Sequence, residues 1–285
     1  MHQNVQCISN KVLALEVILN ESQPDIVMFT EHWQNCDQLS EPNFKNYGLA
    51  SSYCRQSMLH GGACILTNNK LSECVKPIYY KTLSFEGNFE FCCIKLLKLS
   101  TIFITVYRPP SGDVNIFLNN FNDLLEELYN PNEQLIIGGD FNINFLDKTS
   151  KLLINLSDIL QTFGLKIVLH DATRNGVSSK ACLDNFFVSD DIEFSISNIN
   201  FSLSNHFAQI LSVPNYSVAK NKQNTYIWRR KFSDRSYADF LNFIQSESWE
   251  SVFSELHPDR CFNKFFSNFV HYFELCFPLK RYIQN

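Results

Sequence analysis

The sequence has little glycine, no long hydrophobic run and no regular spacing of metal-binding cysteines. It holds nine glycines against 26 phenylalanines, so we expect a core filled largely by aromatic rings. No segment reaches the roughly 18 apolar residues that a membrane-spanning helix needs, and the first residues lack the pattern of a signal peptide. We therefore expect an intracellular protein with no transmembrane segment and no membrane partner.

The ten cysteines do not follow the spacing of a known cysteine motif. None forms a C-x-x-C pair, and no Cys/His cluster has zinc-finger spacing. Several lie inside apolar stretches, such as Cys64 and the pair Cys92-Cys93, where a free cysteine behaves as a small hydrophobic residue. We expect buried, reduced thiols rather than a disulfide framework.

Positive charge is not in excess. The chain has 24 basic and 29 acidic residues, a net charge of −5. This balance argues against a broad basic surface for nucleic acid. It does not exclude a nuclease, because acidic residues can bind metal ions inside a cleft. A chain of 285 residues that is 45% hydrophobic can bury one large core or two small ones.

Apolar strands and amphipathic helices alternate along most of the chain, which is typical of an α/β protein. Pro24 ends the first helical pattern and precedes a short apolar strand. Strands are predicted at 25–30, 63–67, 89–97, 99–107, 135–137, 182–189 and 208–213, and helices at 11–21, 114–129 and 151–163.

The composition changes near residue 217. Six basic residues and one acidic residue stand between Lys220 and Arg235, and residues 236–276 have a helical pattern rich in aromatic residues. We expect one domain over residues 1–217 and a basic, then helical, segment over 218–285. The basic cluster could follow a phosphate backbone or form a solvated linker. Tyr226 and Trp228 could stack on nucleotides or pack in a core.

Polar residues stand beside the ends of several apolar strands. Glu31 follows DIVMFT, Asp140 follows LIIGG, and His206 precedes FAQILSV. A carboxylate at such a place can bind a hard divalent cation through oxygen, and a histidine beside it can stabilise charge on a phosphoryl oxygen. Each residue alone also fits an ordinary turn, so the interpretation depends on the whole set: Glu31, Tyr107, Arg108, Asp140, Asn142, Asp184, Asn205 and His206.

In this order the motifs resemble the endonuclease/exonuclease/phosphatase superfamily, which includes apurinic endonucleases and deoxyribonuclease I. The residues of these motifs are most similar to those of the apurinic-endonuclease-like endonuclease of Jockey-type non-LTR retrotransposons. The resemblance covers residues 1–213 and implies a four-layer α/β sandwich, two mixed β-sheets packed face to face with helices outside. The matching segments are NVQ at 4–6, PDIVMFTEHW at 24–33, VYRPPSG at 106–112, IIGGDFNIN at 136–144, ATR at 172–174 and LDNFFVS at 183–189.

The resemblance also implies roles for these residues in a Mg²⁺-dependent hydrolysis of DNA, with Mn²⁺ as an alternative metal. Glu31 would be the principal metal ligand, supported by Asn4. Asp140 would orient or deprotonate the attacking water, and His206, held by Asp184, would stabilise the transition state. Tyr107 and Asn142 would contact the scissile phosphate or the nucleophile, and Arg108, Thr173 and Arg174 would bind substrate.

Three departures from the family pattern stand out. The final motif of the family is Ser-Asp-His, whereas this chain has Ser204-Asn205-His206. Asn205 can still coordinate metal through its carbonyl oxygen, so we expect a loss of rate on the order of 10²-fold. The first strand of the sheet is expected to be largely missing. Residues 218–285 resemble the segment that joins such endonucleases to a reverse transcriptase, and the polymerase expected in a parent element is absent.

Three interpretations follow from the sequence. The first is a DNA endonuclease of retrotransposon type, acting in the nucleus, weakened by Asn205. The second is an inactive remnant with the same fold, which could bind DNA or a partner. The third is another phosphodiesterase or phosphatase of the superfamily, because fold alone does not fix the substrate.

Overall fold

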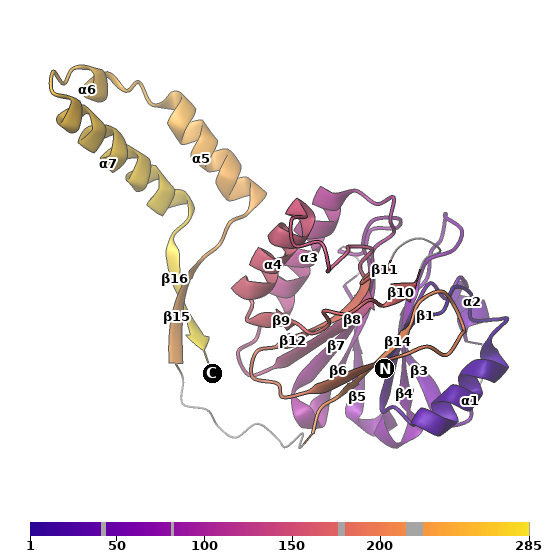
Figure 1. Ribbon diagram of the computed structural model, residues 1–285. Coiled ribbons are helices and arrows are strands. Elements are labelled where there is room, and N and C mark those ends of the chain that lie inside the picture. Colours follow the sequence, from indigo (N-terminus) through magenta and orange to yellow (C-terminus); the bar gives the residue numbers. More distant parts are fainter. Residues whose placement is uncertain (41–43, 81–82, 176–179, 215–224, 285) are drawn as a thin grey trace. The chain divides into compact units, whose positions relative to one another are not determined.

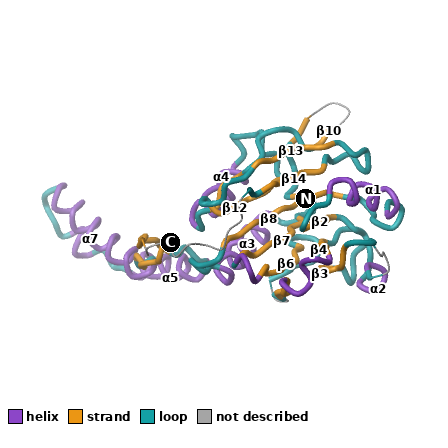
Figure 2. The backbone as a smooth tube through the Cα atoms, turned by 90° about the horizontal axis from the view of Figure 1, so that it is seen from below, coloured by secondary structure: helices purple, strands orange, loops and turns teal. Residues whose placement is uncertain are grey.

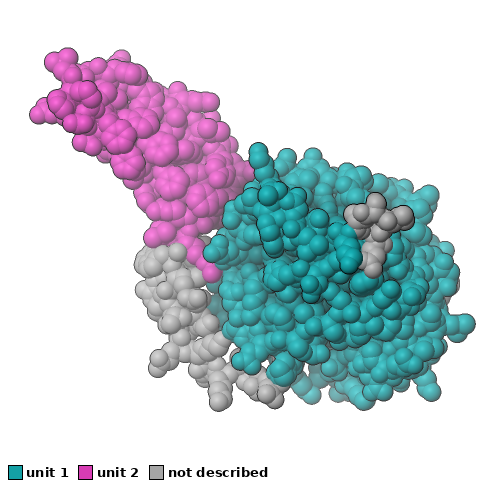
Figure 3. All heavy atoms as spheres, viewed as in Figure 1, with its two compact units in different colours: residues 1–220 teal, residues 221–285 magenta. Residues whose placement is uncertain are grey.

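The computed structural model describes residues 1–40, 44–80, 83–175, 180–214 and 225–284 (Figure 1). The chain divides into two compact units, Met1–Lys220 and Asn221–Asn285, which Figure 3 shows in different colours. The expected boundary near residue 218 falls outside the described residues, as do Lys220 and Lys222 of the basic cluster.

Two six-stranded mixed sheets form the first unit (Figure 2). In each sheet one central pair of strands is parallel, β1 with β2 and β7 with β8, and the other pairs are antiparallel. The strand order of the first sheet is β13 (Ser195–Ile199), β14 (Ala208–Ser212), β1 (His2–Asn4), β2 (Ile26–Thr30), β4 (Ala63–Asn68) and β3 (Tyr47–Tyr53). The strand order of the second sheet is β5 (Val75–Ile78), β6 (Glu90–Leu96), β7 (Thr101–Tyr107), β8 (Gln134–Asp140), β12 (Asp184–Ser189) and β9 (Leu165–Ile167).

Helices lie on the outer faces of the sandwich (Figure 1). The helix α3 begins after Asp113, whose carboxylate accepts hydrogen bonds from two backbone N–H groups of the first turn. Its apolar residues recur every three or four positions, so one face is buried on the second sheet. The helices and short elements of this unit are α1 (Val12–Ser22), α2 (Cys36–Leu39), α3 (Val114–Leu128), α4 (Lys151–Thr162), the 3₁₀ turns Asn69–Cys74 and Leu97–Leu99, and the strand pair β10 (Arg174–Asn175) and β11 (Lys180–Ala181).

Three apolar clusters separate four layers. One joins α3 and α4 to the second sheet, one joins α1 to the first sheet, and the third lies between the two sheets. The expected four-layer sandwich is therefore confirmed. The expected aromatic core is confirmed as well, since the fully buried side chains of this unit include eight phenylalanines: Phe29, Phe89, Phe117, Phe121, Phe141, Phe145, Phe186 and Phe187.

The predicted strands and helices of this unit are all present, with ends that differ by a few residues. The strands β3, β5, β9 and β13 were not predicted. β3 and β13 carry exposed and half-buried residues, so they lack the apolar run of a central strand. Five of the ten free cysteines are buried and Cys36 is exposed, so the expectation of buried thiols holds for half of them.

The second unit is a helical hairpin on a two-stranded ladder. Phe240 of the first long helix packs edge-to-face on Phe269 of the last one. The elements are β15 (Thr225–Arg230), α5 (Asp234–Ser246), α6 (Glu250–Phe253), α7 (Pro258–Cys276) and β16 (Leu279–Gln284). Among the described residues of the chain, no helix combines the length and apolarity needed to cross a bilayer.

Candidate active site

The predicted site residues lie where strands of both sheets end. The parallel strands β1 and β2 end side by side, with Asn4 paired with Thr30 just before Glu31. In the second sheet Tyr107 at the end of β7 pairs with Asp140 at the end of β8, and Asp140 also pairs with Asp184 at the start of β12. The ends of parallel strands meet at one edge of a sheet, which brings these side chains together.

Asn4 connects the two sheets through its side-chain amide. Its Nδ2 donates to Glu31 Oε1 at 2.8 Å and to Asp140 Oδ2 at 2.7 Å. Asn4 and Asp140 are almost fully buried. Two carboxylates that converge on one amide nitrogen lie close enough to share a single cation.

Asp184 and His206 form a buried hydrogen-bonded pair. The Nδ1 atom of His206 lies 2.8 Å from Asp184 Oδ2. Thr173 Oγ1 donates to the same carboxylate oxygen at 2.8 Å and accepts hydrogen bonds from the backbone N–H groups of Leu183 and Asp184. Because Nδ1 is engaged, the ring presents Nε2 as its other donor.

Burial and charge shift the acidity of the two central groups. Burial, with the nearby Asp184 carboxylate, raises the pKa of Asp140 to about 7. Burial alone would lower the pKa of His206, but the charge of Asp184 and its hydrogen bond raise this pKa to about 9. Near neutral pH, Asp140 is therefore poised to accept a proton and His206 carries a positive charge.

The backbone around Glu31 is held in an unusual conformation. Glu31 and Trp33 have φ values of 55° and 58°, which non-glycine residues rarely adopt. The segment is fixed because Glu31 N donates to the carbonyl of Gly62 and Trp33 N to that of Gly61. Trp33 Nε1 also donates to Glu31 Oε2 at 3.1 Å. A Cβ on Gly62 would lie 2.3 Å from the His32 ring, so glycine is required for this close approach.

Asn142 and Tyr107 flank Asp140. Asn142 also has a left-handed backbone, φ 48°, and its N–H donates to Asp140 Oδ1 at 3.0 Å. Tyr107 is buried, and burial together with the charges of Glu31 and Asp140 raises the pKa of its hydroxyl far above the ordinary value. A neutral hydroxyl at this position can donate a hydrogen bond to an anionic ligand.

Two residues expected to bind substrate, Arg108 and Thr173, make hydrogen bonds inside the protein. Arg108 is buried, and its guanidinium donates to the carbonyls of Phe141, Asn142 and Gly112. These bonds stabilise the loop after β8. Thr173 is fully buried beneath Asp184, where it positions that carboxylate.

Asn205 lies at the edge of the site beside Arg174. In the amide orientation that satisfies its neighbours, its oxygen accepts from Arg174 Nε at 3.2 Å and Nη2 at 3.0 Å. Its nitrogen donates to Gln6 Oε1 at 3.2 Å. The side-chain oxygen of Asn205 is thus directed to the Arg174 guanidinium, whereas Glu31 and Asp140 both contact the amide of Asn4.

Some neighbours of the site were not predicted from the sequence. His2 is buried, with Nδ1 2.7 Å from Gln209 Oε1 and 3.9 Å from Asp184 Oδ1. It lies two residues before Asn4, and in a strand such residues share a face, which is the one signal in the sequence. Burial lowers the pKa of His2 to about 4, so the ring is neutral.

A buried ion pair supports the other side of the site. Arg55 Nε lies 2.6 Å from Glu90 Oε1, and the guanidinium carbon lies 5.9 Å from the ring centroid of Tyr107. Glu90 also accepts from the backbone N–H of Gly62. No local sequence pattern indicates this pair, since its members lie 35 positions apart.

The donor set suits a hard divalent cation. Asp140 and Asp184 lie in one cluster with His206, with one side-chain atom of each within 4.8 Å of the others, and the two carboxylates offer oxygen ligands. Glu31 adds a carboxylate that contacts the same amide as Asp140. Among the described residues, none forms a hydrogen bond with the buried Oδ1 of Asp184, so one carboxylate oxygen is left to bind a cation or water.

Comparison with known proteins finds structures of similar fold. Among curated proteins none matches the sequence. The endonuclease domain of TRAS1, a telomere-specific non-LTR retrotransposon, has a similar structure (TM-score 0.57, 16% identity, 74% of this chain and 95% of that one). So do an AP endonuclease from Archaeoglobus fulgidus (0.58, 14%, 75% and 98%) and a mannosyl-6-phosphatase from Bacteroides thetaiotaomicron (0.51, 12%, 74% and 97%).

At these identities the structural likeness shows the fold alone. The family model of the endonuclease/exonuclease/phosphatase family matches residues 1–202, which is more than half of the chain. It includes Asn4, Glu31, Tyr107, Asp140 and Asp184 and ends just before His206. The chain therefore belongs to the endonuclease/exonuclease/phosphatase family.

Proposed function

We propose that this protein is a Mg²⁺-dependent DNA endonuclease of non-LTR retrotransposon type. It would hydrolyse a phosphodiester bond and leave a 3′-hydroxyl and a 5′-phosphate. The observation that carries the proposal is the buried Asp184–His206 pair beside Asp140, with Glu31 and Asn4 at the same strand ends. A base, a cation and a set of metal-binding oxygens are the parts that phosphodiester hydrolysis requires.

Asp140 serves as the base in this mechanism. Its pKa of about 7 is close to the working pH, which favours proton transfer from an attacking water. Asn142 N and Asn4 Nδ2 hold its two oxygens at 3.0 and 2.7 Å, so the carboxylate is fixed before substrate binds. Fixed geometry of this kind reduces the entropy cost of reaching the transition state.

His206 and Arg174 supply positive charge. His206 is charged near neutral pH and donates through Nε2 to a non-bridging phosphate oxygen. Arg174 is half-buried and is held toward the site by Asn205. Because asparagine is neutral, it orients the guanidinium without cancelling its charge, so Arg174 can bind a phosphate of the substrate.

Glu31 would hold Mg²⁺, supported by Asn4, whose amide nitrogen donates to the Glu31 carboxylate at 2.8 Å. When bound, the metal offsets phosphate charge and lowers the pKa of a coordinated water. The tie from Trp33 Nε1 fixes the orientation of the Glu31 carboxylate. Mn²⁺, another cation that prefers oxygen ligands, would fit the same donors.

Two observations favour DNA as the substrate: the residues of the sequence motifs, and the nucleases among the structural neighbours. The phosphatase among the structural neighbours makes hydrolysis of a different phosphate ester the second candidate function. Asn205 favours a third outcome, an inactive protein, because it replaces a carboxylate of the family pattern. These alternatives give different results in one assay.

The test is a supercoiled-plasmid nicking assay with purified protein, in Mg²⁺ and in EDTA. We expect conversion to open circles that requires Mg²⁺ and is lost in the Asp140→Ala and His206→Ala variants. A Glu73→Ala variant, which changes an exposed acidic residue outside the site, is the matched control. No nicking by wild type or by Asn205→Asp, with hydrolysis of a small phosphomonoester instead, would refute the endonuclease and support a phosphatase.

A further inference from the structure

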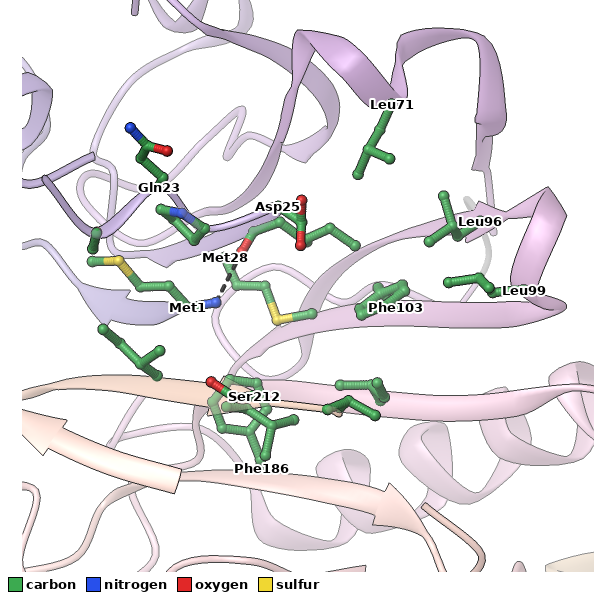
Figure 4. Close-up of a pocket in the computed structure, with 17 residues that line it drawn as sticks. Met1, Gln23, Asp25, Met28, Leu71, Leu96, Leu99, Phe103, Phe186 and Ser212 are labelled. Atoms are coloured by element: carbon green, nitrogen blue, oxygen red, sulfur yellow. Dashed lines mark hydrogen bonds between the residues drawn. The ribbon is translucent and has the colours of Figure 1, made fainter. Parts of the chain in front are cut away.

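The backbone of Asn4 is placed by the sheet, because β1 is held to β2 along its length. At one end of β1 the backbone nitrogen of Met1 donates to Ile26 O at 2.8 Å (Figure 4). At the other end Asn4 pairs with Thr30. This pairing does not decide whether the side-chain amide of Asn4 turns its nitrogen or its oxygen toward the carboxylates of the site. Another contact must fix that orientation.

The turn after β1 fixes the orientation of the amide. Gln6 N donates to Asn4 Oδ1 at 3.2 Å. Asn4 Nδ2 is then the atom that donates to the carboxylates of Glu31 and Asp140. If the Val5–Gln6 peptide group turned over, a carbonyl would face Asn4 Oδ1 in place of an N–H. The amide would then lose its fixed orientation, and its oxygen could face ionised carboxylates, which have no proton to donate.

The turn has a strained backbone. Gln6 and Cys7 have φ values of 44° and 80°, which residues other than glycine rarely adopt. A strained turn persists only where the surrounding structure holds it. The N–H groups of Cys7 and Ile8 donate to backbone carbonyls of residues 31–32 at 2.9 and 3.1 Å. These two bonds begin after the Val5–Gln6 peptide group, so they do not by themselves fix the orientation of that group.

Lys11 holds the peptide group directly. Its ammonium nitrogen Nζ donates to Val5 O and to Gln6 O, the second at 2.6 Å. Val5 O belongs to the same peptide group whose N–H donates to Asn4, so the ammonium prevents this group from turning over. A cation on the carbonyl also polarises the peptide group and strengthens the hydrogen bond that its N–H makes. The contacts therefore run from Lys11 through one peptide group to the amide of Asn4.

We propose that Lys11 is a positioning residue of the site, which holds the Val5–Gln6 peptide group so that Asn4 presents its amide nitrogen to the two carboxylates. The inference rests on the proposed function, because it concerns the same site. In this role Lys11 contacts neither substrate nor metal and acts only through Asn4. Its loss slows the chemical step more than it weakens DNA binding, because a small displacement of catalytic groups can reduce a rate by about 10²-fold.

The experiment compares the purified full chain with the Lys11→Met variant, which removes the ammonium and keeps a side chain of similar length. Lys11→Arg keeps a cation that can donate to carbonyls and is the conservative variant. Lys70→Met changes an exposed lysine of the same unit and is the matched control. NMR of the Asn4 side-chain amide, identified by its absence in Asn4→Ser, measures proton exchange with water in the absence of DNA and metal. Plasmid nicking with Mg²⁺ gives kcat and KM.

We expect Lys11→Met to speed the exchange of the Asn4 amide protons at least about tenfold and to lower kcat by on the order of 10²-fold, with KM changed less than about threefold. Lys11→Arg should restore most of both values, and Lys70→Met should change neither. An unchanged Asn4 amide in Lys11→Met would overturn the proposal. Loss of the fold in this variant, or faster exchange at amides throughout the unit, would show a general structural role and would also overturn it.

The two readouts separate this proposal from the proposed function. Absence of nicking by wild type would refute the endonuclease, whereas the exchange of the Asn4 amide would still decide the role of Lys11. A normal kcat in Lys11→Met, together with faster exchange of the Asn4 amide, would show that nicking does not depend on the orientation of that amide. This result would overturn the positioning role and leave the endonuclease in place.

Discussion

Replacement of Asp184 by asparagine removes the carboxylate that keeps His206 protonated. The pKa of His206 is about 9 against the ordinary 6.5, a difference that corresponds to about 3 kcal/mol. A pKa that is raised on folding contributes stability that is complete below pH 6.5 and is lost as the pH rises through about 9. Because burial lowers the pKa of His206 more than the charge of Asp140 raises it, and Arg174 lowers it further, we expect this pKa to fall below 6.5 in the variant.

Two measurements without metal check this. In urea unfolding, the Asp184→Asn substitution should lower the free energy of unfolding relative to wild type. This decrease should be about 3 kcal/mol larger at about pH 6 than above about pH 9.5. NMR titration of the histidine ring protons should show the His206 transition move from about 9 to below 6.5. With Mg²⁺ present, the alkaline fall of the nicking rate should move to lower pH in the same direction.

The matched control is Asp190→Asn, which neutralises an exposed carboxylate just after the same strand. It should leave the His206 titration and the pH dependence of stability unchanged. Equal pH dependence in wild type and Asp184→Asn would refute the reasoning, because the charge of Asp184 would then not hold His206 protonated. An unchanged alkaline fall of the rate would remove protonated His206 from the mechanism.

Three further predictions follow from the site. Asp140→Asn should abolish nicking yet raise the free energy of unfolding by about 2 kcal/mol at about pH 8, because the buried charge is removed; a less stable variant in urea would contradict this. Gly62→Ala should lower the free energy of unfolding by about 2–3 kcal/mol, since Gly62 has φ +90° and no room for a Cβ. Gly48→Ala is the control: a Cβ there would have its nearest contact at 3.5 Å, so the loss in the same urea assay should be less than about 1 kcal/mol. Asn205→Asp should raise the nicking rate by on the order of 10²-fold while forming an ion pair with Arg174. A rate below that of wild type would mean that the ion pair cancels a positive charge that the phosphate needs.

Much of the site could be predicted because its residues lie next to strands that the sequence makes conspicuous. Glu31 and Asp140 follow apolar runs that become β2 and β8, and Asp184 begins β12. Strand ends in a mixed sheet collect at a few edges, so polar residues there meet whatever the details of packing. The predicted fold needed the family resemblance in addition, since alternation alone does not order the strands.

The remaining residues depend on contacts that no local pattern encodes. Arg108 ends an apolar strand just as Tyr107 does, but its long side chain turns inward to backbone carbonyls. Glu90 stands at the start of β6 and becomes a buried partner of Arg55 only through the fold. Arg174 lies beside Asn205 because an antiparallel β-bridge pairs Arg174 with His206, and this bridge joins segments about 30 positions apart.

The residue at position 205 changes the net charge of the site. Above about pH 7, when Asp140 is ionised, three carboxylates (Glu31, Asp140 and Asp184) face two cationic side chains, His206 and Arg174. One divalent cation would then leave a net positive site, which favours a phosphodiester anion. A carboxylate at position 205 would make the bound site neutral, so Asn205→Asp should tighten Mg²⁺ binding and weaken DNA binding even while it raises the rate. Separate titrations of metal and DNA should therefore move in opposite directions, and parallel changes would show that the charge at position 205 does not reach the site.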